Sequence, residues 1–286
     1  MNKILTICLI MFLFGSAKSA TVTEKIYILS DSLTTVDNVK FPYITFNYTP
    51  DFSQNNPIIE LNQNDSLSLW VVNFDSITHD FIIGEFSTTA ASIPSGDSIH
   101  IGYTFNNPAV YIYHDPINYP TYQYLGLSGL IVVKNHTHNS FYWNIKEHNS
   151  NWNETLMNSG NVDWTLYNPK HFTINGNSNP DINNDPLARI VGNVGDTLIL
   201  NMANTGQSIH SMHFHGYHAT ILYSSKSSLE VNRSKDTFPI YPGESLILRI
   251  IPDKEGEYPV HDHNLVAISA NNLYPNGMFS TILIAP

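Results

Sequence analysis

Short apolar runs separated by polar turns dominate the chain. Four runs are rich in the aliphatic, β-branched and aromatic residues that favour strands: residues 66–72, 109–113, 197–200 and 245–250. Clusters of Gly, Pro, Asn and Asp mark turns at residues 62–65, 94–97, 192–196 and 241–244. No long stretch has the period of an amphipathic helix. The pattern predicts an all-β protein made of sandwiches or barrels.

The order of these features occurs twice. In each half, a turn ending in Asp precedes a strand that ends at an Asn, and a histidine-containing loop follows. A Pro-Ser-Gly or Pro-Gly turn, another strand and a Tyr-containing segment complete the unit, which ends at His114-Asp115 in the first copy and at His261-Asp262 in the second. The repeat predicts two tandem sandwich domains, residues 20–135 and 136–286.

The N-terminus has the features of a secretory signal. Lys3 precedes the apolar run of residues 4–14, and the small residues Ala17 and Ser19 suit cleavage after Ser19. The run is too short to span a bilayer comfortably. We interpret residues 1–19 as a signal peptide, with an uncleaved anchor as the alternative. A periplasmic or secreted protein without membrane attachment after cleavage is therefore expected.

Composition narrows the range of partners and of chemistry. The formal net charge is -11, which opposes binding to nucleic acid and to anionic membrane surfaces. The only cysteine, Cys8, lies inside the signal. The mature chain is thus expected to form no disulfide and to offer no thiolate to a metal. The fingerprints of serine hydrolases, phosphate loops, dinucleotide sites and zinc proteases are also missing.

The histidines carry the candidate chemistry. Six of the 13 histidines fall in residues 210–218 and 261–263. Residues two apart on a strand point to the same face, so His213 pairs with His215, and His261 pairs with His263. Neutral imidazole suits copper, zinc, iron and nickel, and two such pairs in one β domain indicate a metal site. The alternative is a polar patch or a hydrogen-bonded cluster.

Other histidines lie in polar or linker stretches. These are His136, His138, His148 and His171, and we expect their side chains to be solvated.

Several motifs together resemble a known superfamily. Residues 171–176, 194–197, 210–216, 235–237, 242–244 and 256–278 occur in the order found in multicopper oxidases and copper nitrite reductases. Residues 44–47, 72–73, 111–114 and 126–133 are similar to the first domain of these proteins. The resemblance covers nearly the whole mature chain. It implies two tandem cupredoxin-like domains, each a Greek-key β-sandwich or barrel.

The resemblance also implies a copper cluster. Multicopper oxidases hold three coppers with four His-x-His pairs, and two pairs are intact here, His213/His215 and His261/His263. The other two pairs are each reduced to one histidine, His79 and His114. In two-domain relatives the cluster lies between the first domain of one subunit and the second domain of the next. The family thus implies a homotrimer with an intersubunit metal site.

The blue copper site departs from the family. Asp262 stands where the family has its copper-binding cysteine, and Asp115 shows the same replacement in the first domain. His210 matches one remaining ligand and Met278 the axial thioether, whereas another histidine is missing near Ala267. A carboxylate cannot form the copper–thiolate bond, so no blue colour is expected. The alternative is that the two aspartates hydrogen-bond locally or orient histidines, and that Met278 belongs to the core.

Two functions remain open. The first is a copper-dependent oxidoreductase that acts on oxygen, nitrogen oxides or a small reductant at a histidine-only cluster, or at a three-histidine copper formed by His79, His114 and His263 as in nitrite reductase. The second is a protein that stores, buffers or delivers copper. The surviving ligands match the catalytic cluster rather than the relay, which favours the oxidoreductase. Zinc remains an alternative metal.

Overall fold

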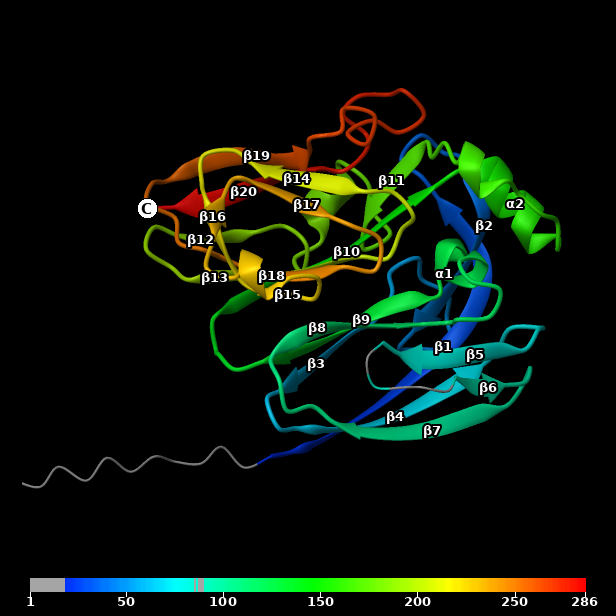
Figure 1. Cartoon of the computed structure of the whole chain (residues 1–286). Coiled ribbons are helices and arrows are strands. Elements are labelled where there is room, and N and C mark those ends of the chain that lie inside the picture. The colour runs from blue at the N-terminus through cyan, green and yellow to red at the C-terminus, as the bar shows by residue number, and fades with distance from the viewer. Residues whose placement is uncertain (1–18, 85, 87–89) are drawn as a thin grey trace, which may run out of the picture.

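The computed structural model describes residues 19–84, 86 and 90–286 (Figure 1). The predicted signal peptide lies almost entirely outside the described residues. Within the described part of the chain, no helix is long and apolar enough to cross a membrane.

The first half of the chain forms two facing sheets (Figure 1). The four-stranded sheet has the order β2-β1-β4-β7, with strands Lys40–Asn47, Thr21–Thr34, Ser66–Asn73 and Ser98–Thr104. The five-stranded sheet has the order β3-β9-β8-β5-β6, with strands Ile58–Asn62, Ser128–Lys134, Ala109–His114, His79–Ile83 and Ala91–Ile93. Phe46, Leu69 and Ile131 are fully buried in the core between them.

The second half repeats this arrangement with a second pair of sheets. The inner sheet has the order β11-β10-β13-β18-β15-β16, with strands His171–Ile174, Asn139–His148, Leu198–Asn204, Ser245–Ile250, Ala219–Ser224 and Ser234–Lys235. The outer sheet has the order β12-β20-β19-β14-β17, with strands Val191–Asn193, Phe279–Ala285, Gly256–Asp262, His210–Phe214 and Thr237–Ile240. Trp143 and Phe214 stack in the core between these sheets.

The sequence repeat corresponds to a repeat of topology. β1 runs parallel to β4 as β10 runs parallel to β13, and β3 runs parallel to β9 as β12 runs parallel to β20. The Asn that ends β4 and the Asn that ends β13 make matching contacts. Asn73 Nδ2 donates to the carbonyls of Ile77 and Ile93, and Asn204 Nδ2 donates to those of Ser208 and Ile240.

The predicted strands are confirmed as β4, β8, β13 and β18. The predicted turns are tight because each has one residue with a positive φ: Asn64, Gly96, Gly195 and Gly243. Asn and Gly tolerate this left-handed conformation better than other residues. The turn aspartates of the repeat also have matching roles, since Asp65 accepts from the backbone N–H of Asn62 and Asp196 from that of Asn193.

Within residues 19–84, 86 and 90–286, helices are few and short. They are α1 (Thr121–Leu125), α2 (Ser150–Met157) and the 3-10 turns η1 (Trp164–Leu166), η2 (Asp181–Asn184) and η3 (Ser228–Glu230). The pattern of hydrophobic residues missed α2, which lies in the Asn-rich stretch after β10. Asn149 caps this helix by accepting from the N–H of Asn151. Leu156 packs it against the core of the first half, so this stretch does not belong to the second sandwich alone.

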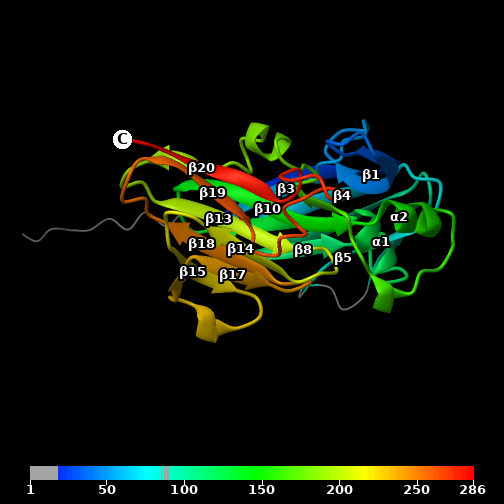
Figure 2. The same ribbon diagram turned by 90° about the horizontal axis from the view of Figure 1, so that it is seen from above.

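The two sandwiches meet along a continuous apolar interface. Val110, Leu130 and Val132 of the five-stranded sheet pack against a matching apolar surface of the inner sheet, formed by Tyr142, Ile199, Ala203 and Ile247. All seven residues of β13 are consequently buried, because this strand faces its own core on one side and the first sandwich on the other. Seen from above, α1 and α2 cover one end of this assembly (Figure 2).

Candidate metal centre

The two histidine pairs lie on neighbouring strands of the outer sheet. β14 and β19 are antiparallel, and His213 stands directly opposite His261. Strand alternation turns Met212 and Phe214 into the core and leaves His213 and His215 on the outer face. The same alternation buries Asp262 and turns His261 and His263 outward. The sequence prediction that each pair shares a face is therefore confirmed.

The four rings form one cluster, called here the histidine face. Ring centroids are 4.7 Å apart for His213 and His215, 5.5 Å for His213 and His263, and 5.1 Å for His215 and His261. The Nε2 atoms of His215 and His261 are 3.0 Å apart. This spacing suits a hydrogen bond, and it also suits two nitrogens that bind one metal ion at about 2.0 Å each.

Neighbouring groups orient the rings of the histidine face. His213 Nδ1 lies 2.8 Å from Thr237 Oγ1, and His261 Nδ1 lies 2.8 Å from the backbone oxygen of Asp262. A carbonyl can only accept, so His261 carries its proton on Nδ1 and directs the Nε2 lone pair outward. Burial, together with the rings of His213 and His261, lowers the pKa of His215 and so favours its neutral, ligand form.

The histidine face does not form a closed ligand shell. Among the residues that the structure describes, no three His, Asp, Glu or Cys side chains are arranged to hold a metal ion between them. His215 and His263 are exposed, so the outer side of the cluster is open. Imidazole nitrogens suit copper, but one chain brings them together only in pairs, as His215 and His261 show.

His210 points away from this face and into a buried site. Its Nδ1 lies 2.5 Å from Asp262 Oδ2, and its Nε2 lies 2.9 Å from Glu147 Oε2. All three side chains are fully buried. Burial alone would lower the pKa of His210, but the two carboxylates outweigh it and raise the pKa to about 9. We call this group the Glu147–His210–Asp262 triad.

The structure places His79 differently from the prediction of a metal ligand at a subunit interface. The side chain is fully buried, with Nδ1 2.7 Å from Asp115 Oδ2 and Nε2 2.9 Å from Asp75 Oδ2. Burial again opposes the charge, and both carboxylates together raise the pKa of His79 above its ordinary value. Neither ring nitrogen is free to bind a metal. This group is the Asp75–His79–Asp115 triad.

His114 stands apart from the histidine face. It ends β8, in the five-stranded sheet of the first sandwich, whereas the histidine face lies on the outer sheet of the second (Figure 1). Its Nδ1 is buried without a hydrogen-bond partner. Burial lowers the pKa of the ring to about 4, so His114 is neutral at pH 7 and keeps a free lone pair.

Comparison with known proteins identifies the fold. The sequence profile of the multicopper oxidase family matches residues 162–275. No curated protein matches the chain in sequence. The blue copper oxidase from Nitrosomonas europaea is 19% identical, with a TM-score of 0.79 over 93% of this chain and 86% of that one. The copper nitrite reductase from Nitrosomonas europaea is 17% identical, with a TM-score of 0.73 over 93% of this chain and 94% of that one.

The chain has the two-domain cupredoxin fold of multicopper oxidases and copper nitrite reductases. A further multicopper oxidase, mgLAC, is 19% identical, with a TM-score of 0.77 over 94% of this chain and 88% of that one. The predicted resemblance and the predicted fold class are thus confirmed.

Each cupredoxin domain has a triad at the place where the resemblance implies the family's blue copper. Asp262 and Asp115 stand where the resemblance implies the family's cysteine, and they bond His210 and His79. His79 was expected to match a ligand of the copper cluster, but it begins β5 as His210 begins β14, so the repeat makes it the equivalent of His210. Met278 is fully buried in the core of the second domain, beside Ala267. The alternative interpretation of both aspartates as local hydrogen-bonding groups agrees with this geometry, although their partners are His79 and His210 rather than the outward-facing histidines.

Three buried groups of this region were missed by the sequence analysis. Asp75 and Glu147 complete the triads, and Lys146 is fully buried beside Glu147 on β10. The available signal was that Lys146 and Glu147 directly follow Trp143-Asn144-Ile145 in one strand-like run, because Lys and Glu in a buried strand need partners.

The prediction of solvated side chains was wrong for His148 and His171. Both are buried, and Phe41 packs against both rings. Neither nitrogen of His148 has a hydrogen-bond partner, and burial lowers its pKa well below the ordinary value. The polar neighbours in the sequence concealed this burial between the two domains. His138, in contrast, is exposed as predicted.

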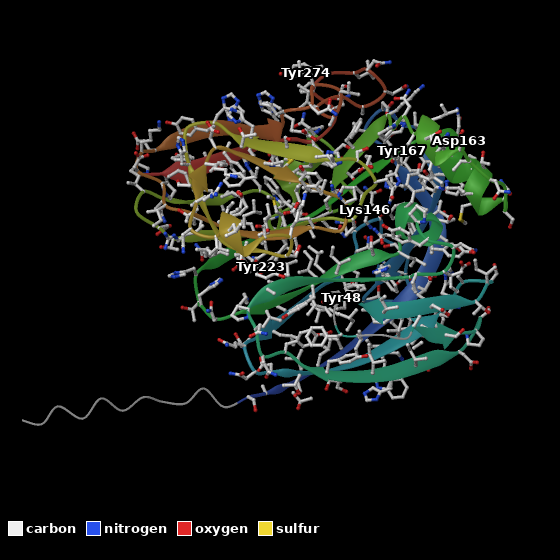
Figure 3. The ribbon with its side chains drawn as sticks, in the orientation of Figure 1. Tyr48, Lys146, Asp163, Tyr167, Tyr223 and Tyr274 are labelled. Carbon is white, nitrogen blue, oxygen red and sulfur yellow. The ribbon has the colours of Figure 1, made fainter. Side chains whose placement is uncertain are left out.

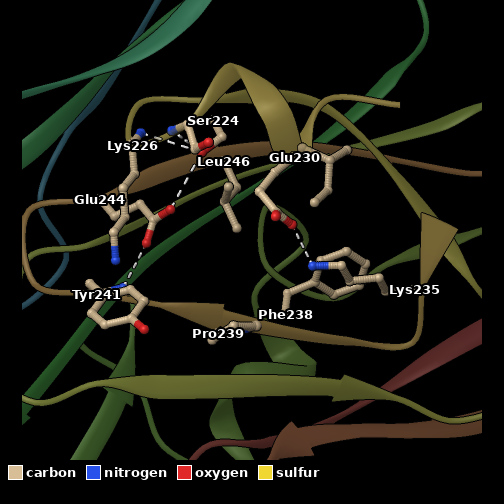
Figure 4. A pocket seen from close by; sticks show the side chains of 11 residues that line it. Ser224, Lys226, Glu230, Lys235, Phe238, Pro239, Tyr241, Glu244 and Leu246 are labelled. Carbon is tan, nitrogen blue, oxygen red and sulfur yellow. Dashed lines mark hydrogen bonds and ion pairs between the residues drawn. The ribbon is translucent and has the colours of Figure 1, made fainter. Parts of the chain in front are cut away.

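A cavity of about 260 Å³ opens at the edge of the second domain (Figure 4). Its walls are Phe238, Leu246 and neighbouring side chains, and its charged groups are largely paired, with Lys235 close to Glu230. No histidine lines this cavity. It is therefore not a candidate metal centre.

Proposed function

We propose that this chain is an exported copper-dependent oxidoreductase that uses a histidine-only copper site and lacks a blue copper relay. The observation that carries the proposal is the approach of His215 Nε2 to His261 Nε2 at 3.0 Å within a cluster of four outward-facing imidazoles. The fold is that of copper oxidoreductases, and copper is the metal implied by the family.

The chain's own residues hold and orient the ligands. Thr237 and the backbone oxygen of Asp262 fix the Nδ1 atoms of His213 and His261, so the Nε2 atoms face outward. Partners of this kind tune metal affinity strongly. Bound copper would supply one-electron chemistry and an open coordination position. Because the outer side of the histidine face is exposed, a small oxidant or reductant reaches it directly.

The substrate class follows from the missing relay. Without a blue copper, an electron donor has to contact the histidine cluster itself. Oxygen, nitrogen oxides and small reductants satisfy this requirement, and the nitrite reductases of similar fold act on a small molecule of this kind.

A second subunit would complete the ligand set. One chain offers only pairs of ligands, and His114 of the first domain is neutral and only partly buried. We propose a homotrimer in which His114 of one subunit approaches the histidine face of the next, as the resemblance implies. His79 is not included, because both of its ring nitrogens bind carboxylates.

A copper-binding protein for storage or delivery is the second candidate. The observation that favours it is the presence of buried triads at both blue copper positions, which leaves no internal electron relay. An exposed histidine face also suits transfer of copper to a partner. Turnover of oxygen or nitrite by the copper-loaded protein distinguishes the two functions.

Replacement of the ligands tests the proposal. His213→Ala and His263→Ala should lower copper affinity by at least about 10-fold and abolish oxygen or nitrite turnover. His138→Ala is the matched control, because His138 is an exposed histidine of the segment between the domains. Copper content is measured after gel filtration, with turnover on the same sample. Unchanged copper content and turnover in both ligand variants would refute the assigned site.

A further inference from the structure

We propose that neither blue copper position of this chain binds a metal, because each is filled by an ionic clamp, a buried imidazole held between two carboxylates, whose second carboxylate comes from one of two aligned positions in the first domain and from the other in the second. The clamps are the Asp75–His79–Asp115 triad and the Glu147–His210–Asp262 triad. The inference concerns residues outside the histidine face, so it stands independently of the proposed function.

The two triads have the same geometry. The Nδ1 atom lies 2.7 Å from Asp115 in the first domain and 2.5 Å from Asp262 in the second. The Nε2 atom lies 2.9 Å from Asp75 in the first and 2.9 Å from Glu147 in the second. The imidazoles and both cysteine-position aspartates are fully buried. The same arrangement in both domains, with the second carboxylate supplied from different positions, indicates that it is not a chance contact.

This arrangement excludes copper. An ionised carboxylate only accepts hydrogen bonds, so a ring held between two carboxylates carries a proton on each nitrogen. Such an imidazolium has no lone pair for a metal, because metal ligands must be deprotonated. Copper bound at either nitrogen would have to displace that nitrogen's proton and break its buried charge-assisted bond, and the chain offers no thiolate there in exchange.

The second carboxylate comes from a different place in each domain. β1 aligns Ile28 with Asn73, and β10 aligns Ile145 with Asn204. Asn73 and Asn204 are equivalent, since each oxygen also accepts the N–H two residues on, from Asp75 and from Gly206. Two residues further along the chain from these aligned positions, Ser30 of the first domain is therefore equivalent to Glu147 of the second, and Asp75 is equivalent to Gly206.

The exchanged side chains occupy the same space. In the first domain the short Ser30 donates to Asp75, and Asp75 carries the carboxylate. In the second domain Glu147 carries it, and a Cβ on Gly206 would lie 1.9 Å from Glu147 Oε2. Even the backbone contact is preserved, because Asp75 Oδ1 accepts from Ser76 N–H and Glu147 Oε1 accepts from Gln207 N–H. In each domain, one of the two positions therefore supplies the second carboxylate and the other holds a small residue. Asp75 and Ser30 have these roles in the first domain, and Glu147 and Gly206 have them in the second.

A swap of these residues tests the inference. In the full chain with ¹⁵N-labelled histidine, we expect His79 and His210 to show two protonated ring nitrogens at pH 7. Glu147→Ser should remove this signature from His210. The double variant Glu147→Ser/Gly206→Asp should restore it, whereas Gly206→Asp alone should reduce soluble yield because of the clash. If Glu147→Ser fails to fold, recovery of folded protein in the double variant is the expected result.

Metal exclusion is read on the same samples. Addition of Cu(I), which is diamagnetic, should shift the ring resonances of the histidine face and leave those of His79 and His210 unchanged. His79→Gln should bind as much copper as the unaltered chain. The inference is overturned if Cu(I) shifts either triad histidine, or if the double variant regains neither the imidazolium signature nor folded protein. Neither result depends on whether the histidine face is catalytic.

Discussion

At the residue scale, one step along a strand decides the role of a histidine. Along β14 and the residue that follows it, His210 points into the core and becomes part of a triad, whereas His213 and His215 point outward. On β19, Asp262 points inward between two outward histidines. The same imidazole group is thus a buried cation between two carboxylates in one place and a candidate metal ligand among other imidazoles in the other.

The raised pKa of His210 predicts a dependence of stability on pH. Its folded pKa of about 9 lies above the ordinary value of 6.5. Its contribution is therefore complete below pH 6.5 and is lost as pH rises to about 9, which amounts to about 3 kcal/mol of unfolding free energy.

Urea unfolding of the metal-free chain at several pH values measures this effect. The His210→Gln variant should lack this part of the decline, since glutamine does not titrate. An equal slope in both proteins between pH 6.5 and 9 would show that His210 is not the group responsible.

At the element scale, three adjacent strands build the histidine face. β14 supplies His213 and leads directly into His215, β19 supplies His261 and leads directly into His263, and β17 supplies Thr237 directly opposite His213. The arrangement of the histidine rings therefore depends on how these strands are aligned. Thr237 of β17 contributes to it because its hydroxyl hydrogen-bonds Nδ1 of His213.

Replacement of Thr237 tests this dependence. Thr237→Val keeps the β-branched shape but removes the oxygen that holds His213 Nδ1. We expect copper affinity to fall by about 10-fold, as for other partners of metal-bound histidines, with no loss of fold. Titration against a copper chelator measures the change. Thr220→Val on β15 is the control, and equal affinities for the two variants would contradict the role of Thr237.

At the scale of the whole molecule, the two domains are joined by an apolar interface with a lysine at one side. Lys146 Nζ donates to the carbonyls of Gly126 and Ser128 in the first domain, 2.8 and 3.1 Å away, and lies between the two sandwiches (Figure 3). Burial holds the pKa of Lys146 well below its ordinary value. The folded chain therefore binds this proton less well than the unfolded chain, which lowers stability at neutral pH.

Replacement of Lys146 should consequently be tolerated. Both carbonyls keep another donor, Ser128 N–H for Gly126 and Asn144 Nδ2 for Ser128. We expect Lys146→Met to raise the unfolding free energy at pH 7 by about 1–4 kcal/mol, as when buried ionic groups are replaced by apolar ones. Lys170→Met, on an exposed lysine, should change it by less than about 0.5 kcal/mol. A loss of stability in Lys146→Met would show that its hydrogen bonds outweigh the cost of burial.

The sequence predicted those features that depend on local pattern. Strand alternation placed His213 with His215 and His261 with His263, and the turn residues located tight turns such as that at Gly243. It did not predict contacts between distant strands. Glu147 is 63 residues from His210, so its place in a triad depends on the alignment of β10 beside β13.

The sequence did not predict which side chains are buried at the domain interface either. His148 and His171 lie in polar sequence, yet the packing of the two domains excludes them from water. Helix α2 was missed for a related reason, since its apolar residues Trp152 and Leu156 pack on the core of the other domain.

We assign copper to the histidine face and to neither triad. The most direct measurement is the copper content per chain of exported, copper-loaded protein, with electron paramagnetic resonance and visible absorption of the same sample. For this assignment we expect bound copper with a normal-copper signal and no blue absorption. The bound copper and its signal should both be lost in a His213→Ala/His263→Ala double variant. Blue absorption, no bound copper, or copper that survives this double variant would contradict it.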